Sequence, residues 1–254
     1  MNNKTELSYR GLIIPSILVL VLVASFIWFP HNPLDSKDRE PTRGPFDLAP
    51  IPELVLDEGV LSELQSRNMH TIGYIANDLH TAVYIVDLTT REYLGRLNFI
   101  PEEPRGGPKS IALTPDNEYF IVTRGKYSND ILVIDANNYT LVKQIPGGKY
   151  NGPIEVNKRL NEAYILSGNY QDTNLYILDL EAFEVTETID LKDDLGTLTL
   201  SDNTLCVTTE KGVTLIDTIS REVTNQVAMN TSYWKQIVTH PYLPVVYVVN
   251  NPSV

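Results

Sequence analysis

The sequence contains a single cysteine, Cys206, among its 254 residues. One thiol excludes a disulfide scaffold, a cysteine-rich zinc module and an iron–sulfur cluster held by cysteines. Basic residues are also scarce, since 20 Lys and Arg stand against 32 Asp and Glu, a formal net charge of −12. Duplex nucleic acid is therefore excluded as a partner, because binding its phosphates requires a basic face. Charged residues at 20% and hydrophobic residues at 43% exclude wholesale disorder.

Catalytic and metal-binding motifs are absent as well. The four histidines, His31, His70, His80 and His240, form no H-x-x-x-H, H-E-x-x-H or C-x-x-C-H pattern, so neither zinc nor c-type haem is expected. The sequence has no G-x-S-x-G motif and no glycine-rich phosphate loop. Cys206 lies in an apolar stretch, where a small buried side chain is expected. The sequence thus predicts no cofactor and no metal, and it gives an enzymatic function little support.

One long apolar run, residues 11–29, contains no charged residue. As a helix it spans roughly 28 Å, close to the hydrocarbon thickness of a bilayer. Lys4 and Arg10 precede the run and several acidic residues follow it, so the positive-inside rule predicts a single-pass anchor in the cell membrane. Residues 1–10 form the cytoplasmic tail and the rest of the chain lies outside. A cleaved signal peptide is the alternative, but its apolar region has only about 7–15 residues, so we favour an uncleaved anchor.

Two segments separate the anchor from the rest of the chain. Residues 30–52 contain six prolines among charged and polar residues, which predicts an extended, semi-rigid tether. Residues 53–70 are ambiguous, because Leu61 and Leu64 suit a helical turn while residues 54–56 suit a strand. We leave the conformation of this lead-in segment open.

A repeat organises residues 71–254. Four short apolar strands end on an aspartate, and each is followed by a polar turn and another strand; the aspartates are Asp87, Asp135, Asp179 and Asp217. Two further strands precede each later copy of this strand–turn–strand unit. Four short strands per unit of roughly 40–45 residues are typical of a β-propeller blade. Spacing alone also suits a sandwich, but a sandwich has no reason to repeat its turns.

The repeat resembles a known family. The turn at residues 114–117 (TPDN) is similar to the S-P-D-G-like turn of the YVTN-type β-propeller repeat. Residues 247–250 (YVVN) are similar to its Y-V-T-N strand, and residues 131–146 to its V-x-V-I-D-T-x-T-N segment. The resemblance implies an all-β propeller of the kind found in surface-layer and secreted or anchored proteins. Related folds occur in propeller lactonases and in subunits of periplasmic redox enzymes, so the resemblance says little about chemistry.

The number of strands leaves the ring open to three interpretations. The repeat comprises three complete four-stranded blades, three strands of one blade and two of another, about four to five blades in all. A seven-bladed ring at roughly 42 residues per blade requires about 295 residues. The chain is therefore an incomplete, open arc, or a four-bladed ring in which the C-terminal first strand completes the three N-terminal strands, or a part completed by a second chain. We favour the open arc, whose edges permit self-association.

The repeated aspartates are predicted to be structural. An aspartate that ends a strand accepts hydrogen bonds from backbone N–H groups two or three residues further on. Calcium binding is the alternative, but no dense D-x-D-x-D spacing is present.

One rim of the propeller is predicted to bind a partner. It carries the loops between second and third strands and the links between blades. These segments contain aromatic and basic residues, namely Arg124, Lys126, Tyr127, Lys149, Tyr150, Tyr170, Tyr233, Trp234 and Lys235. Such a patch on an acidic protein suits a protein or a cell-surface polymer. The alternative is that these tyrosines pack between blades.

Two sequons, at Asn138 and Asn230, are possible glycosylation sites outside the membrane. Taken together, the sequence predicts a membrane-anchored, extracytoplasmic β-propeller that acts as a non-catalytic binding or cell-envelope module. The alternative is a propeller enzyme, lactonase-like, or a subunit of a redox enzyme.

Overall fold

The computed structural model describes most of the chain beyond residue 50. The described residues are 51–67, 69–100, 106–124, 128–148, 152–169, 172–192, 196–209, 211–229, 235–240 and 242–250. The predicted cytoplasmic tail, the anchor segment and residues 30–50 of the tether lie outside them. Within the described ranges, no helix combines the length and the apolar character of a membrane span.

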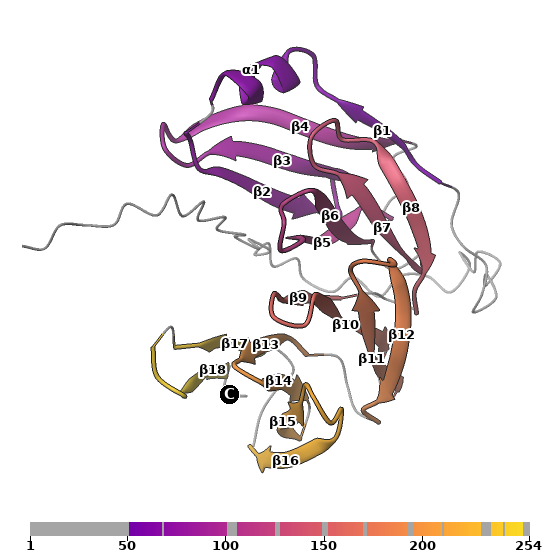
Figure 1. The fold of residues 1–254 in the computed structure, drawn as a ribbon, viewed down its shortest axis with the longest axis vertical. Helices are drawn as coiled ribbons and strands as arrows, with labels where there is room; N and C mark the ends of the chain where they lie inside the picture. Colours follow the sequence, from indigo (N-terminus) through magenta and orange to yellow (C-terminus); the bar gives the residue numbers. More distant parts are fainter. Residues whose placement is uncertain are drawn as a thin grey trace, which may run out of the picture.

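The described part is built from antiparallel sheets (Figure 1). The first sheet has the order β1–β4–β3–β2, with β1 at Glu53–Leu56, β2 at Ile72–Asn77, β3 at Ala82–Asp87 and β4 at Glu92–Ile100. The second contains β5 at Pro108–Leu113, β6 at Tyr119–Arg124, β7 at Asp130–Asp135 and β8 at Leu141–Pro146, paired in chain order.

Two further four-stranded sheets follow the same plan. The third contains β9 at Ile154–Asn157, β10 at Glu162–Asn169, β11 at Asp172–Asp179 and β12 at Glu184–Asp190. The fourth contains β13 at Leu198–Ser201, β14 at Thr204–Thr209, β15 at Gly212–Asp217 and β16 at Val223–Ala228. A two-stranded sheet of β17 at Lys235–Thr239 and β18 at Val246–Asn250 comes last.

The sheets follow one another around an arc, as the blades of a propeller do. The strands β5, β9, β13 and β17 are neighbours on the inside of the arc, and β8, β12 and β16 lie on its outside (Figure 1). The first sheet and the β17–β18 pair stand apart at its two ends (Figure 1). The described residues thus form an all-β fold of four-stranded antiparallel sheets, as the repeat predicts.

Apolar clusters between successive sheets hold the arc together. The cluster between the third and fourth sheets, for example, is made by Tyr164, Leu166, Leu175 and Ile177 from one sheet and Leu198, Leu205, Val207 and Ile216 from the other. A sheet in the middle of the arc buries both of its faces, so its strands are apolar at successive positions instead of alternating with polar residues. All positions of β7 except its last are buried for this reason.

The four strand pairs that contain the repeated aspartates have the same irregularity. In each pair, the register shifts between the second and the first residue ahead of the aspartate. In β3–β4, for example, it shifts between Ile85 and Val86, ahead of Asp87. The pair β3–β4 therefore corresponds to β7–β8, and β2 corresponds to β6. The first sheet lacks a counterpart of β5 among the described strands, and β1 is added instead at its outer edge beside β4.

Residues 53–66, which the sequence left open, contain both predicted alternatives. The strand β1 pairs with β4, and a short helix, α1, follows at Val60–Ser66. Val60 is buried, and Leu61 and Leu64 pack against the cluster between the first two sheets. The glycine at position 95 allows this contact, because a Cβ there would lie 2.4 Å from the side chain of Val60.

Candidate functional site

The strand pairing brings two kinds of segment to the same rim. In an antiparallel sheet of consecutive strands, the loop from second to third strand and the link that leaves the fourth strand lie at the same edge. Hydrogen bonds join the described ends of these segments. The Ser128 hydroxyl donates to the carbonyl of Gly106 at 3.0 Å, and the Thr123 hydroxyl donates to the carbonyl of Gly152 at 2.8 Å. We call the edge that carries these segments the loop rim.

Close packing fixes the links against the sheets that follow them. At Gly148, a Cβ would lie 2.2 Å from the hydroxyl oxygen of Ser167, and at Gly196 it would lie 1.8 Å from the backbone oxygen of Thr208. Real Cβ atoms do not approach backbone oxygen so closely, so glycine is required at position 196, where the link crosses the end of β14. Gly148 and Gly196 therefore lie directly against the ends of β10 and β14.

Arg124 is the one member of the predicted patch whose side chain is described. It is 5% exposed. Its Nε donates to Oδ1 of Asp130 at 2.7 Å and a terminal nitrogen bonds Oδ2, while Nε2 of Gln144 donates to the same carboxylate at 2.6 Å. The guanidinium is bonded to Asp130 at the base of the loop, and little of its surface is accessible to a ligand.

The other members of the predicted patch are not described in full. The side chain of Lys235 lies outside the described part, although its backbone begins β17. The remaining residues, Lys126, Tyr127, Lys149, Tyr150, Tyr170, Tyr233 and Trp234, all lie outside the described residues. The structure therefore describes only residues that flank the segments in which they lie.

The repeated aspartates lie on the opposite rim and cap the turns that follow β3, β7, β11 and β15. In each turn, Oδ1 accepts hydrogen bonds from the N–H groups two and three residues further on, at 2.7–3.1 Å. This is the geometry of an Asx turn. No group of three potential metal ligands occurs in the described residues.

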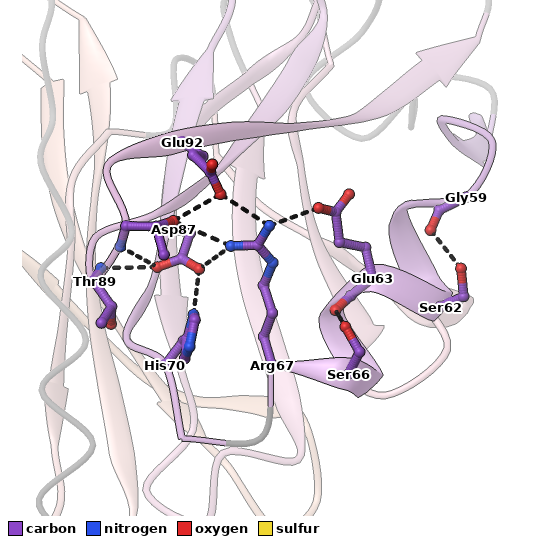
Figure 2. A network of polar contacts seen from close by, with 10 residues as sticks. Gly59, Ser62, Glu63, Ser66, Arg67, His70, Asp87, Thr89 and Glu92 are labelled. Atoms are coloured by element: carbon purple, nitrogen blue, oxygen red, sulfur yellow. Dashed lines mark hydrogen bonds and ion pairs between the residues drawn. The ribbon is translucent and has the colours of Figure 1, made fainter.

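Asp87 differs from the other three aspartates because it also bonds charged side chains (Figure 2). Nδ1 of His70 lies 2.5 Å from its Oδ2, and a guanidinium nitrogen of Arg67 pairs with the same oxygen. Arg67 in turn contacts Glu63 at 2.7 Å and Glu92 at 2.9 Å. The sequence did not single out Arg67 or His70, since neither belongs to a recognisable motif.

The charges in this cluster stabilise one another. Burial by itself raises the pKa of the Asp87 carboxyl, but hydrogen bonds from His70, the N–H of Thr90, Arg67 and the N–H of Thr89 hold that pKa well below its ordinary value. The bond to Asp87 is also the main reason that the pKa of Arg67 is raised. The carboxylate therefore stays ionised and bonded, and the cluster ties the end of α1 to the first sheet.

A second polar cluster joins the third and fourth sheets. A terminal nitrogen of Arg221 pairs with Oε1 of Glu162 at 2.5 Å, and the other donates to the Tyr164 hydroxyl at 3.2 Å. Glu162 also accepts from the Tyr164 hydroxyl at 3.0 Å. The arginine comes from the turn after β15 and its partners come from β10, so this cluster fastens two successive sheets together.

An inner strand carries a partly buried acid that the sequence did not single out. Oε1 of Glu155, on β9, accepts a hydrogen bond from the N–H of Leu200 on β13 at 3.4 Å. Burial raises the pKa of this carboxyl to about 7, and the single bond from Leu200 offsets only part of that effect. Glu155 is therefore the described carboxyl group whose protonation changes near neutral pH.

Three other positions that the sequence singled out are Asn138, Asn230 and Cys206. Asn138 is exposed in the turn after β7, where its side-chain oxygen accepts from the N–H and the hydroxyl of Thr140 at 2.9 and 2.6 Å. Asn230 lies outside the described residues. Cys206 is buried on β14, and burial raises the pKa of its thiol.

Comparisons with known proteins identify the fold. No protein-family model matches the chain, and no curated protein matches it. Among solved structures, a chain of hydrazine synthase from Kuenenia stuttgartiensis is similar with a TM-score of 0.61 and 22% sequence identity, over 70% of this chain and 51% of that one. Dihydro-heme d1 dehydrogenase NirN in complex with DHE gives a TM-score of 0.47 and 13% identity, over 60% of this chain and 33% of that one.

The likeness to hydrazine synthase establishes the fold class. Its matching chain is a β-propeller protein, and the sheets of the present chain are arranged in the same way. The present chain spans about half the length of that chain. At 22% identity the match shows a shared fold, so the function must be argued from the residues of this chain.

Proposed function

We propose that this protein is a non-catalytic binding module of the cell envelope, built on a YVTN-type β-propeller. In this proposal residues 11–29 hold the chain in the membrane with its N-terminus in the cytoplasm. The sheets lie outside and bind a protein or a cell-surface polymer. The binding surface is the loop rim, with Tyr127, Tyr150, Tyr170 and Trp234 as its aromatic residues.

One observation carries the choice of surface. Ser128, at the end of a loop, bonds the link at Gly106, and Thr123, near the end of β6, bonds the next link at Gly152. In this proposal the segments that these bonds flank present their aromatic and basic residues together at that edge. Tyrosine and tryptophan are the residues that most often dominate binding energy at protein interfaces.

The cluster around Asp87 suits a structural role. A catalytic carboxylate or imidazole needs a free position from which to exchange a proton or contact a substrate. The Asp87 carboxylate is fully buried and already bonds His70, Arg67 and two backbone N–H groups. Its arrangement suits the attachment of α1 to the first sheet.

Replacing Tyr127 and Tyr170 together by alanine tests the proposed rim. The full chain, immobilised in detergent, is used to recover material from a cell-surface extract. We expect the double variant to recover at least about tenfold less, because each aromatic anchor contributes about 1–2 kcal/mol or more to binding. Recovery equal to that of the wild type rejects the rim as the binding surface.

The matched control is Tyr242→Ala. Tyr242 is 89% exposed and lies between β17 and β18, in a first-to-second-strand turn on the opposite rim. Its replacement removes an exposed tyrosine ring and is expected to leave recovery unchanged. A loss in this control would mean that exposed tyrosines bind the extract wherever they lie.

The second candidate is a propeller enzyme, lactonase-like or a subunit of a redox enzyme. The likeness in fold to hydrazine synthase is the observation that raises it. Turnover of a substrate separates this candidate from the first.

A further inference from the structure

A buried hydroxyl without a partner lies at the loop rim, where the first sheet meets the second. Thr81 ends the loop between β2 and β3, and its carbonyl accepts from the N–H of Phe99 at 2.9 Å. Phe99 belongs to the apolar cluster between the first two sheets, so the Thr81 side chain shares the face that packs against the second sheet. Thr81 is 3% exposed, and among the described residues its hydroxyl oxygen has no hydrogen-bond partner.

Lys109 reaches the same place from the second sheet. Ile111 and Leu113, also on β5, pack against the cluster between the first two sheets. Alternate residues of a strand share a face, so Lys109 is directed towards the first sheet. The register between β5 and β6 shifts at Lys109, which makes this lysine the extra residue of a β-bulge. A bulge leaves its extra residue out of the regular pairing and redirects the side chain.

The two segments lie directly against each other. A Cβ at Gly107 would lie 2.6 Å from the Cα of Thr81 and 2.9 Å from the backbone oxygen of Asp78. The charge of Asp78 also acts on the ammonium of Lys109, two residues beyond this glycine. We call the place where residues 78–81 meet residues 106–109 the first junction.

A lysine at this place distinguishes the first junction from the later ones. Equivalent apolar residues on the first strands of the second, third and fourth sheets are Ile111, Ile154 and Leu198. Two residues earlier stand Lys109, Gly152 and Gly196, respectively. At Gly196 the backbone of Thr208 leaves no room for a side chain. The bulge in β5 therefore provides a place for a cation that the fourth sheet does not have.

The ammonium of Lys109 lacks a close counter-charge. Among the described residues it forms no hydrogen bond and no ion pair. The residue remains accessible to water, but the neighbouring segments partly desolvate its ammonium and lower its pKa, and the charge of Asp78 offsets only part of this effect. A partly desolvated cation gains from a bound anion, and a buried hydroxyl gains from an acceptor.

We propose that the first junction is an oxyanion site, in which the Lys109 ammonium and the Thr81 hydroxyl bind a phosphate or carboxylate group. Both side chains donate hydrogen bonds, and both face the same junction from opposite sheets. Lysine binds phosphate as a point charge, and hydrogen bonds to a charged group are the strong ones. The glycine at position 107 keeps the two segments close enough for one anion to contact both.

The oxyanion site deepens the proposed function, on which it rests, because the first junction lies on the loop rim. In this proposal the partner bound at the rim carries an anionic group. The rest of the chain is acidic, with a net charge of −12, so it repels an anionic partner everywhere except at such a cation. Lys109 therefore determines where on the protein that group is bound.

Protection of Lys109 from acetylation tests the site. The full chain in detergent is treated with trace acetic anhydride, and peptide mass spectrometry gives the rate at each lysine. We expect about 20 mM inorganic phosphate, at constant ionic strength, to slow the acetylation of Lys109 at least about fivefold, with half the effect near about 1 mM. Lys143 on β8 and Lys158 in the turn after β9 are internal controls and should react equally fast with and without phosphate.

Thr81→Val tests the hydroxyl while keeping the shape of the side chain. It is expected to raise the phosphate concentration for half protection about fivefold, the effect of losing one hydrogen bond. Thr173→Val is the matched control, because Thr173 holds the corresponding place in the third sheet, is also buried and also has an unpaired hydroxyl among the described residues. It should leave the protection of Lys109 unchanged. Each variant is first checked for a wild-type unfolding midpoint.

A second pair of probes identifies the source of the anion. Acetate and polygalacturonate carry the same carboxylate group, free in one case and on a polymer in the other. Protection by polygalacturonate at a lower carboxylate concentration than acetate requires assigns the site to an anionic polymer. Protection at equal carboxylate concentrations assigns it to a small free anion. Both results retain Lys109 and Thr81 as the binding residues.

Three outcomes overturn the proposal. Lys109 is acetylated at the same rate with and without phosphate, or Lys143 and Lys158 are protected as strongly as Lys109, or Thr81→Val leaves the protection unchanged. The recovery experiment with Tyr127→Ala and Tyr170→Ala keeps this test separate from the proposed function. Protection of Lys109 in a chain whose recovery does not depend on the tyrosines rejects the rim and keeps the anion site. Tyrosine-dependent recovery without protection rejects the anion site alone.

Discussion

Asp130→Ala is expected to lower the free energy of unfolding by about 3–5 kcal/mol, the usual cost of removing one partner of a buried ion pair. The Asp130 carboxylate is fully buried and accepts hydrogen bonds from Arg124 and Gln144. Without it, the guanidinium of Arg124 stays at 5% exposure and loses the charge that compensates its burial. Urea denaturation of the variant and the wild type measures the difference.

An exposed ion pair provides the control for Asp130. Oε1 of Glu184 lies 3.3 Å from Nζ of Lys143, and the two side chains are 70% and 38% exposed. Glu184→Ala is expected to change stability by less than about 1 kcal/mol, because solvent screens such pairs. If Asp130→Ala costs no more than Glu184→Ala, the pair with Arg124 does not hold the base of the rim loop as the structure indicates.

Glu155→Gln is expected to stabilise the protein at alkaline pH and to have little effect in acid. Burial raises the pKa of Glu155 from the model-compound value of 4.5 to about 7. Between these two values the folded state binds more protons than the unfolded state, so stability falls as pH rises. Above about pH 7 the folded protein bears the full cost of an ionised carboxylate at this position. A shift of this size corresponds to roughly 3 kcal/mol, which the glutamine variant avoids.

Urea denaturation at pH 4.5 and pH 8 measures the effect as the difference between variant and wild type. That difference should grow by roughly 2–4 kcal/mol towards pH 8. Glu118→Gln removes the same charge from an exposed turn and should follow the wild type at both pH values. A Glu155→Gln curve that stays parallel to the wild type would show that the carboxyl group is not desolvated.

The repeat made the sheets predictable from sequence. Short apolar strands with an aspartate at the end of the third strand define each blade, and Asp87, Asp135, Asp179 and Asp217 accept the turn hydrogen bonds that an aspartate forms there. The positions of these strands and aspartates depend on local strand pairing and turn chemistry, which the sequence pattern shows directly. The strand β1 was harder to predict, because four residues outside the repeat become a strand only by pairing with β4.

The polar clusters depend on contacts between distant segments, which sequence patterns do not display. Arg67 and His70 meet Asp87 only because α1 folds back onto the first sheet. Arg124 has the type and loop position of a surface residue, yet it is buried because Asp130 lies opposite it where β7 begins. Glu155 occupies an inner strand whose neighbouring blade, through Leu200, determines its burial. In each case the decisive partner comes from another strand, turn or sheet.

The central claim is that this propeller binds a partner and does not catalyse a reaction. Turnover by the purified full chain, offered a panel of lactones and a set of redox dyes, tests that claim most directly. We predict rates no higher than those of a heat-denatured sample at the same protein concentration. Steady turnover that increases in proportion to protein concentration and is lost on denaturation would contradict the account and establish the enzyme instead.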